Sequence, residues 1–150
     1  MSDSLTFDGG RLEDVIVELQ QLGDGARQRL MAAVVEQAVI FEQVVITDKL
    51  SGQVLNQVSG RLVGSVFQDV SDEGDRIMGT VSADTPYSRI HEYGGIIEPV
   101  NALALHFEIG GKWIYAKRVV MPERSYLRST LEERADEIRA ALLQAVASAA

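Results

Sequence analysis

The chain has 150 residues, no cysteine, two histidines, and 46% hydrophobic residues. This length favours a single domain over residues 1–150 with a core of its own, and the lack of cysteine excludes disulfides, thiolate catalysis and zinc–thiolate sites. The 14 basic and 22 acidic side chains give a net charge of −8, which argues against a free-standing nucleic-acid binder, because phosphate binding needs clustered lysine and arginine.

The charge is unevenly distributed. Residues 1–75 hold 5 basic and 13 acidic side chains, whereas residues 76–150 hold nine of each. Within residues 112–128, Glu123 is opposed by five basic side chains, which are Lys112, Lys117, Arg118, Arg124 and Arg128. An ordinary solvated strand face has this composition, and so does a patch that meets an acidic surface, including one on another copy of the chain.

No targeting or membrane-spanning segment is expected. Met1–Gly10 is acidic and polar, unlike a signal peptide. Glu36 and Glu42 interrupt the most apolar stretch, Leu30–Ile46, and charged side chains are costly in lipid. We therefore expect a soluble protein that begins in a reducing cytoplasm.

The first third of the chain predicts helices. Met1–Gly10 is expected as a flexible arm or an edge strand, and Arg11–Leu22 as a short helix, because its apolar residues recur at three- and four-residue steps. Asp24 is expected to cap a long helix over about residues 25–50. The apolar stripe of that helix consists of Leu30, Val34, Ala38, Phe41 and Val45. Ile40 falls on its polar face, either as a single exposed side chain or as a subunit contact.

The middle of the chain predicts strands. Ser59 is a candidate cap for a short helical turn that carries Leu62 and Val66 inward; alternatively, Leu62–Val70 is all strand. Residues 67–70 and 77–83 flank a polar turn, which is typical of a hairpin.

A short helix and a second hairpin are expected next. Tyr87–Tyr93 predicts the helix, which Gly94-Gly95 ends. Leu103–Ile109 and Trp113–Val120 alternate apolar and polar residues on either side of Gly110-Gly111, which makes this the clearest hairpin in the sequence.

A final helix is expected over about Ser125–Ala149. Its apolar stripe consists of Leu127, Leu131, Ala135, Ile138, Leu142 and Val146. Because strands occur in consecutive hairpins, the element order favours an α+β fold, in which an antiparallel sheet of about four to five strands packs against a long N-terminal helix and a C-terminal helix.

Few residues could carry acid–base or metal chemistry. His91, Glu92 and His106 are the candidates, but adjacent helical residues diverge by about 100° and do not share a ligand field easily. Nothing in the spacing brings His106 beside the other two. No phosphate loop, nucleophile elbow or calcium loop is present in the sequence. We therefore expect no enzyme, no metal and no cofactor.

Three motifs in order carry a resemblance to a known family. The first segment runs from Leu50 to Val66 and contains Ser59-Gly60-Arg61-Leu62-Val63-Gly64-Ser65. The second is Tyr87-Ser88-Arg89-Ile90-His91-Glu92-Tyr93-Gly94-Gly95, and the third is Met121-Pro122-Glu123-Arg124-Ser125-Tyr126-Leu127-Arg128. Over roughly residues 25–145, this order resembles the neck and tail-completion (head–tail joining) proteins of long-tailed bacteriophages. The chain departs from that pattern at Ser125, where the family often has a proline, so the start of the last helix is less defined.

The resemblance implies a structural protein of the virion, made in the host cytoplasm. Such a protein forms a ring, a hexamer or larger, at the head–tail junction. Its implied neighbours are a head-closure or connector protein and a tail-terminator or tail-tube protein, without a membrane. The acidic excess could also line a DNA passage to which DNA does not stick.

The candidate interface combines the basic segment, its aromatic neighbour and one residue of the long helix. Its members are Ile40, Lys112, Lys117, Arg118, Arg124, Tyr126 and Arg128. Alternatives remain open: a tail-terminator or other minor tail protein, a small histidine- and carboxylate-dependent hydrolase, or a host-encoded soluble binding module.

Overall fold

The computed structural model describes residues 3–6, 23–53 and 60–148. A long helix near each end and strands between them confirm a mixed helix and strand architecture. The elements are β1 (Asp3–Thr6), α1 (Asp24–Val44), the π-helical η3 (Val45–Gln53), the 3-10 turn η4 (Val63–Ser65), β2 (Val66–Asp72), β3 (Ile77–Ala83), α2 (Ser88–Tyr93), β4 (Gly95–Ile97), β5 (Leu105–Ile109), β6 (Lys112–Ala116), β7 (Val119–Met121) and α3 (Leu127–Ala147). The predicted helix at Arg11–Leu22 and the cap at Ser59 lie outside the described residues.

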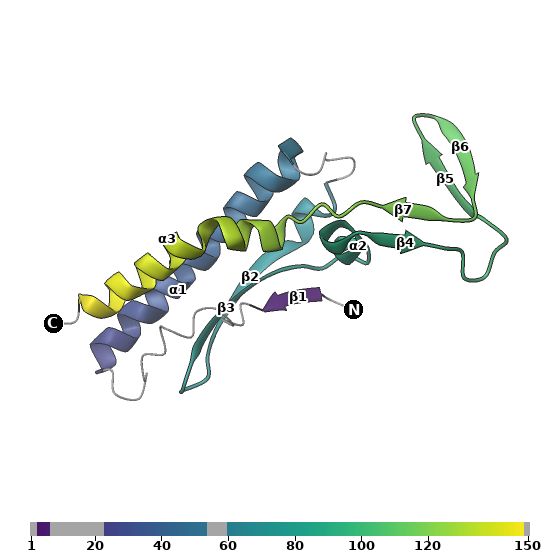
Figure 1. Ribbon diagram of the computed structural model, residues 1–150. Coiled ribbons are helices and arrows are strands. Elements are labelled where there is room, and N and C mark those ends of the chain that lie inside the picture. The colour runs from purple at the N-terminus through teal and green to yellow at the C-terminus, as the bar shows by residue number, and fades with distance from the viewer. Residues whose placement is uncertain (1–2, 7–22, 54–59, 149–150) are drawn as a thin grey trace.

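The expectation of one sheet with four to five strands is wrong for the described part of the chain. Its strands form a three-stranded antiparallel sheet in the order β1-β3-β2 and two separate ribbons, β4-β7 and β5-β6. The reason is that the chain leaves the body at Gly94, and the strands that follow pair with each other beyond its edge (Figure 1).

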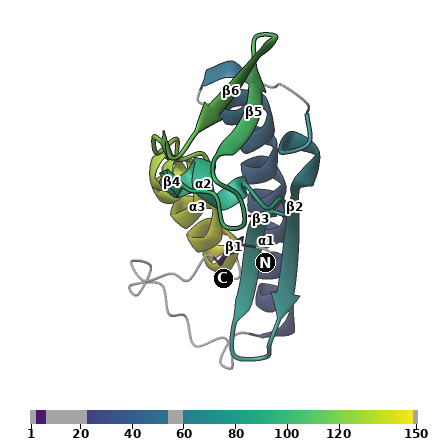
Figure 2. The same cartoon turned by 90° about the vertical axis from the view of Figure 1, so that its right-hand side faces the viewer.

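The body consists of the three-stranded sheet, α1 and α3. Helix α1 packs across β2 and β3, and α3 lies along α1 (Figures 1 and 2). The β2–β3 register pairs Val66 with Ala83, and both are buried on the face that meets α1. The core consists of Phe41, Val45, Leu50, Val66, Val81, Ala83, Tyr126, Leu127 and Ile138. The apolar stripes predicted for the two long helices thus supply much of this core.

The long N-terminal helix differs from its prediction at the N-terminal cap, whereas its end agrees with the prediction. Gly23 occupies the cap position and Asp24 is already helical, without a side-chain capping bond. The helix then continues as η3 until Gly52, whose φ of 120° ends it. Within η3, the nearly buried Lys49 donates from Nζ to Oε1 of Glu133 at 2.6 Å and so joins this region to α3.

The stretch Asp24–Gly52 is long and apolar enough to cross a membrane by length and composition, with a mean hydropathy of 1.6 over its most apolar window. The core helix of a soluble protein meets the same criteria. Here Phe41, Val45 and Leu50 belong to the core, and 22% of the most apolar window is buried.

Residues 95–121, which we call the arm, extend away from the body. The β4-β7 ribbon leads outward, and the β5-β6 hairpin lies at its far end (Figure 1). The tight turn between β5 and β6 is confirmed, because Gly110 and Gly111 have φ angles of 57° and 77°, which glycine adopts without strain. The predicted strand Trp113–Val120 is interrupted between β6 and β7, and its second part pairs with β4 instead.

Candidate functional site

The arm exposes large apolar side chains. Of the exposed side chains of this kind in the described residues, most lie on the arm: Ile96, Ile97, Val100, Leu103, Ile109, Trp113, Tyr115 and Val120. Single exposed apolar residues are ordinary on soluble proteins, but a concentration of them on one projecting segment is typical of an interaction site.

Three rings stack on one face of the hairpin. His106 lies directly opposite Tyr115 in the register and diagonal to Trp113. Its ring centroid is 4.3 Å from that of Tyr115 and 4.4 Å from that of Trp113, with both pairs stacked. Trp113 and Tyr115 remain 62% and 70% exposed. We call these three residues the aromatic ladder.

The opposite face of the hairpin is also apolar. Phe107 and Ile114 pair there and are half-buried, while Ile109 near the turn is 60% exposed. An isolated two-stranded hairpin is marginally stable in water unless something packs against it. A hairpin that is apolar on both faces and stands away from the body is therefore a candidate interaction element.

Three predicted interface residues frame this hairpin. Lys112, Lys117 and Arg118 are all exposed, and none of them forms an ion pair within the part of the chain that the structure describes. Lys112 opens β6, and the other two lie between β6 and β7. These three basic side chains therefore lie on an accessible segment, and their role in an interface stays a prediction.

The two ends of the arm meet at the body in a region that we call the joint. Here Glu92 of α2 caps α3. Its carboxylate accepts the Ser125 hydroxyl at 2.7 Å and the backbone N–H groups of Tyr126, Leu127 and Arg128 at 2.8, 2.9 and 2.9 Å. Helix α3 has no side-chain cap of its own at Tyr126. A buried carboxylate at this place satisfies otherwise unpaired donors and interacts favourably with the helix dipole.

Gly94 brings the two ends of the arm together. It has a φ of 67°, and a Cβ at this position would lie 2.6 Å from the backbone nitrogen of Glu123 and 2.9 Å from the carbonyl oxygen of Met121. Next to it, the Arg124 N–H donates to the His91 carbonyl at 2.9 Å. The residues of the second and third motifs thus pack backbone against backbone, and they fix where the arm leaves the body.

The remaining predicted interface residues differ in how far their side chains are exposed to solvent. Tyr126 is fully buried, and its hydroxyl donates to the Ser88 carbonyl at 3.4 Å. A side chain in the core is not available to a partner, so Tyr126 is removed from the predicted interface. Arg124 is exposed. Ile40 is half-buried rather than exposed.

Arg128 is held by neighbours at the joint. Its guanidinium pairs with Glu123 and lies 5.3 Å from the ring centroid of Tyr93, which is within the range of a cation–π contact. This side chain therefore stabilises the base of the arm, in addition to any contact with a partner.

The three candidate acid–base residues each take part in a packing or hydrogen-bonding contact within the chain. His91 packs edge-on against Tyr87; burial lowers the pKa of His91, and the positive charge of Arg124 lowers it further. Both oxygens of Glu92 are taken up in capping α3. His106 belongs to the aromatic ladder. No three histidine or acidic residues within the described ranges are grouped as metal ligands.

The sequence named the basic neighbours of the aromatic ladder but not the ladder itself. The available signal was the alternation in Trp113–Lys117, which puts Trp113 and Tyr115 on one face. Exposure could not be predicted, because a hairpin inside a larger sheet has the same pattern.

Comparison of the chain with protein-family models, with curated proteins and with solved structures found no match.

Proposed function

We propose that this chain is a structural protein of the head–tail junction of a tailed bacteriophage. It completes the tail or joins it to the head connector by forming a ring through protein–protein contacts. The observation that carries the proposal is the arm: a projecting, apolar and locally basic hairpin, anchored to the body at both ends.

The joint supports the proposal from the residues of the motifs. Glu92, Gly94 and Arg124 belong to the second and third motifs that resemble the neck and tail-completion proteins, and they meet at the base of the arm. A protein that acts by assembly needs its contact element held at a defined angle, because a ring closes only when each contact turns the next subunit by the same amount. The position of these residues is consistent with that requirement.

The shape and charge of the chain also favour assembly over catalysis. A ring of more than two subunits uses two different patches of each subunit, which must complement each other. The arm supplies a protruding apolar patch with basic side chains, and the rest of the chain is acidic. Charged groups around such an apolar contact give it specificity and orientation.

The test is to remove the gene from the phage or prophage that encodes it and to examine the particles in the lysate by electron microscopy. We expect separate heads and separate tails of normal length, and joined particles when the gene is supplied in trans. Complementation by Trp113→Ala with Tyr115→Ala should fail, whereas the matched control Phe67→Ala, an exposed aromatic on β2, should restore joining.

Two outcomes would overturn the proposal. Joined, infectious particles without the gene would show that the protein is not needed at the junction. Tails of irregular length would instead assign the protein to termination of the tail rather than to its joining.

A further inference from the structure

The interruption of the arm between β6 and β7 carries two adjacent basic residues. Lys117 and Arg118 are the one place in the sequence where two of the 14 lysines and arginines are neighbours. The ladder of β6 ends at Ala116 and that of β7 begins at Val119, so the pair lies in irregular backbone between two extended segments. Both side chains are exposed. The fold thus places the dibasic pair of this sequence at a break in the arm.

The extended backbone beside the pair has an unpaired edge. Among the described strands, β6 has β5 as its single neighbour and β7 has β4, so the other edge of each is open. An extended chain segment binds such an edge through main-chain hydrogen bonds. The active-site cleft of an endoprotease holds its substrate extended in the same way. The backbone of β6 and β7 therefore already has the form that a protease binds.

The structure beside the pair opens easily. The ladder of β4 and β7 joins three residue pairs, Gly95–Ile97 with Val119–Met121, and a two-stranded ribbon is marginally stable by itself. On the other strand of the arm, Val100 and Leu103 between β4 and β5 are 91% and 95% exposed. Segments with few buried contacts open at a low free-energy cost, and proteolytic nicking concentrates there.

The two cations have no partner within the part of the chain that the structure describes. Neither Lys117 nor Arg118 takes part in a hydrogen bond or an ion pair there, whereas Arg27 on α1 pairs with Asp72. Proteases that select basic residues bind them through carboxylates in their specificity pockets. Two adjacent, unpaired cations on extended backbone suit such a pair of pockets.

We propose that the Arg118–Val119 bond is a processing site for an endoprotease that recognises paired basic residues. Water adds to the carbonyl carbon of Arg118, and the peptide bond breaks. The products are a carboxylate on Arg118 and an amino group on Val119. The fragments are residues 1–118 and 119–150.

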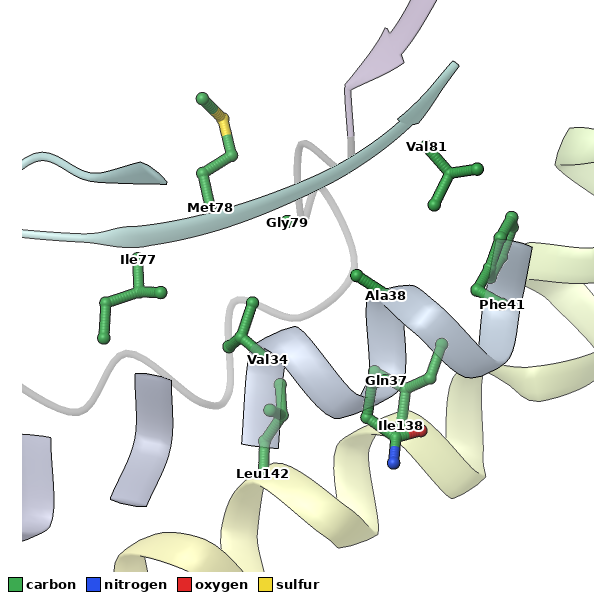
Figure 3. A pocket seen from close by; sticks show the side chains of 10 residues that line it. All are labelled: Val34, Gln37, Ala38, Phe41, Ile77, Met78, Gly79, Val81, Ile138 and Leu142. Carbon is green, nitrogen blue, oxygen red and sulfur yellow. The ribbon is translucent and has the colours of Figure 1, made fainter. Parts of the chain in front are cut away.

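The body holds the two fragments together after the cut. Ile138 and Leu142 of α3 belong to the second fragment, and they lie against side chains of α1 and β3 from the first (Figure 3). Across the same division, Lys49 pairs with Glu133, and Glu92 caps the start of α3. We therefore expect the cleaved chain to stay folded.

The cut changes the arm instead. In the intact chain the backbone connects both ends of the arm to the joint (Figure 1). After cleavage the β5-β6 hairpin is attached through residues 95–104 alone, so the body no longer sets its direction from two sides. The consequence rests on the proposed function: cleavage inactivates an unassembled copy, whereas a neighbour that covers the arm protects an assembled one.

The test is limited digestion of the folded chain with a kexin-type endoprotease, which cuts after Lys-Arg, followed by mass spectrometry. Asp75→Lys adds a matched site, because Asp75 and Arg76 are both exposed. That site lies in the tight β2–β3 turn, where the Arg76 carbonyl accepts the Glu73 N–H at 2.9 Å. The surface ion pair between the same two side chains protects little. Synthetic peptides that span residues 111–124 and 69–82, the latter with the same substitution, give the intrinsic rate of each site.

Relative to the matching peptide, we expect cleavage after Arg118 to be roughly tenfold faster than cleavage after Arg76, because a closed turn must open before it enters the protease as an extended strand. Lys117→Gln should abolish the cut in the arm. The cleaved chain should elute as one species in size-exclusion chromatography, with its helical circular dichroism unchanged.

An arm that stays uncut would overturn the inference, and so would equal relative rates at the two sites. Loss of the helical signal on cleavage would contradict the expectation that the cut acts on the arm alone. Because the digestion uses the free chain, it is independent of the head–tail role. Purified particles that contain the chain and are cut as fast as the free chain would contradict protection by a neighbour, whatever the outcome for the site itself.

Discussion

The Glu92 carboxylate on α2 accepts the backbone N–H of Leu127 at 2.9 Å and so caps α3, a helix that begins at Leu127, 35 residues further along the chain. The arm is the segment between these two elements. Its two ends are therefore fixed by one buried carboxylate and by the backbone contact at Gly94. The contacts with the body therefore set the direction in which the arm projects.

Replacing Glu92 should destabilise the whole protein. Glu92→Ala leaves three backbone N–H groups and the Ser125 hydroxyl without their acceptor at a buried helix end, which costs about 3 kcal/mol of unfolding free energy. Glu92→Gln keeps one acceptor oxygen and should cost about half as much. Urea denaturation followed by circular dichroism measures both. The matched control is Glu137→Gln, an exposed residue of α3; equal stability of Glu92→Ala and this control would contradict the capping role.

Replacing Gly94 should displace the base of the arm. In Gly94→Ala the new Cβ meets the backbone of Glu123 and Met121, which cannot move as a side chain would. Gly110→Ala is a matched control, because that residue also has a positive φ but no atom within 4 Å of the added Cβ. We expect Gly110→Ala to lose about 1 kcal/mol from backbone strain and Gly94→Ala to lose clearly more. Similar losses in thermal unfolding experiments would show that the close approach is unimportant.

His91 should make stability depend on pH in a defined window. Burial and Arg124 lower the pKa of His91 below its ordinary value of 6.5, so the unfolded chain takes up the proton more readily than the folded one. The free energy of unfolding should therefore fall as the pH drops below 6.5, until His91 is protonated in the folded state as well. His91→Gln should reduce this slope. An NMR titration checks the premise, and a midpoint for His91 at or above 6.5 would refute it.

The aromatic ladder should matter for association more than for folding. Trp113→Ser with Tyr115→Ser removes two side chains that are mostly exposed, and surface substitutions usually change stability by about 0.5 kcal/mol or less. We expect an unchanged midpoint of thermal unfolding and a lower average mass in sedimentation equilibrium at high concentration. A large loss of stability would instead indicate that the ladder belongs to the fold.

Local patterns predicted much of this fold. The stripe that includes Ala38 and Phe41 and the one that includes Ile138 face the core, and Gly110-Gly111 forms the expected turn. The partition of the strands into three sheets could not be predicted, because pairing such as Ile96 with Val120 joins distant residues. Several strand registers satisfy the same alternation.

The site was harder to predict than the elements. The sequence offered Glu92 as a candidate acid–base residue beside His91. Its capping role could not be predicted, because the backbone groups that it binds lie more than 30 residues further along the chain. Tyr126 lies in a basic, surface-like segment but is buried by that same joint. Only the basic side chains of the arm could be placed from sequence, because charge itself keeps a residue at the surface.

The most direct test of the central claim, that this chain acts by fitting against other virion proteins, is electron cryomicroscopy of purified phage particles with mass spectrometry of their proteins. The account predicts that the chain is present and that its density forms a ring at the head–tail junction, with the arm of each copy in contact with a neighbouring subunit. Purified infectious particles that contain none of this chain would contradict it.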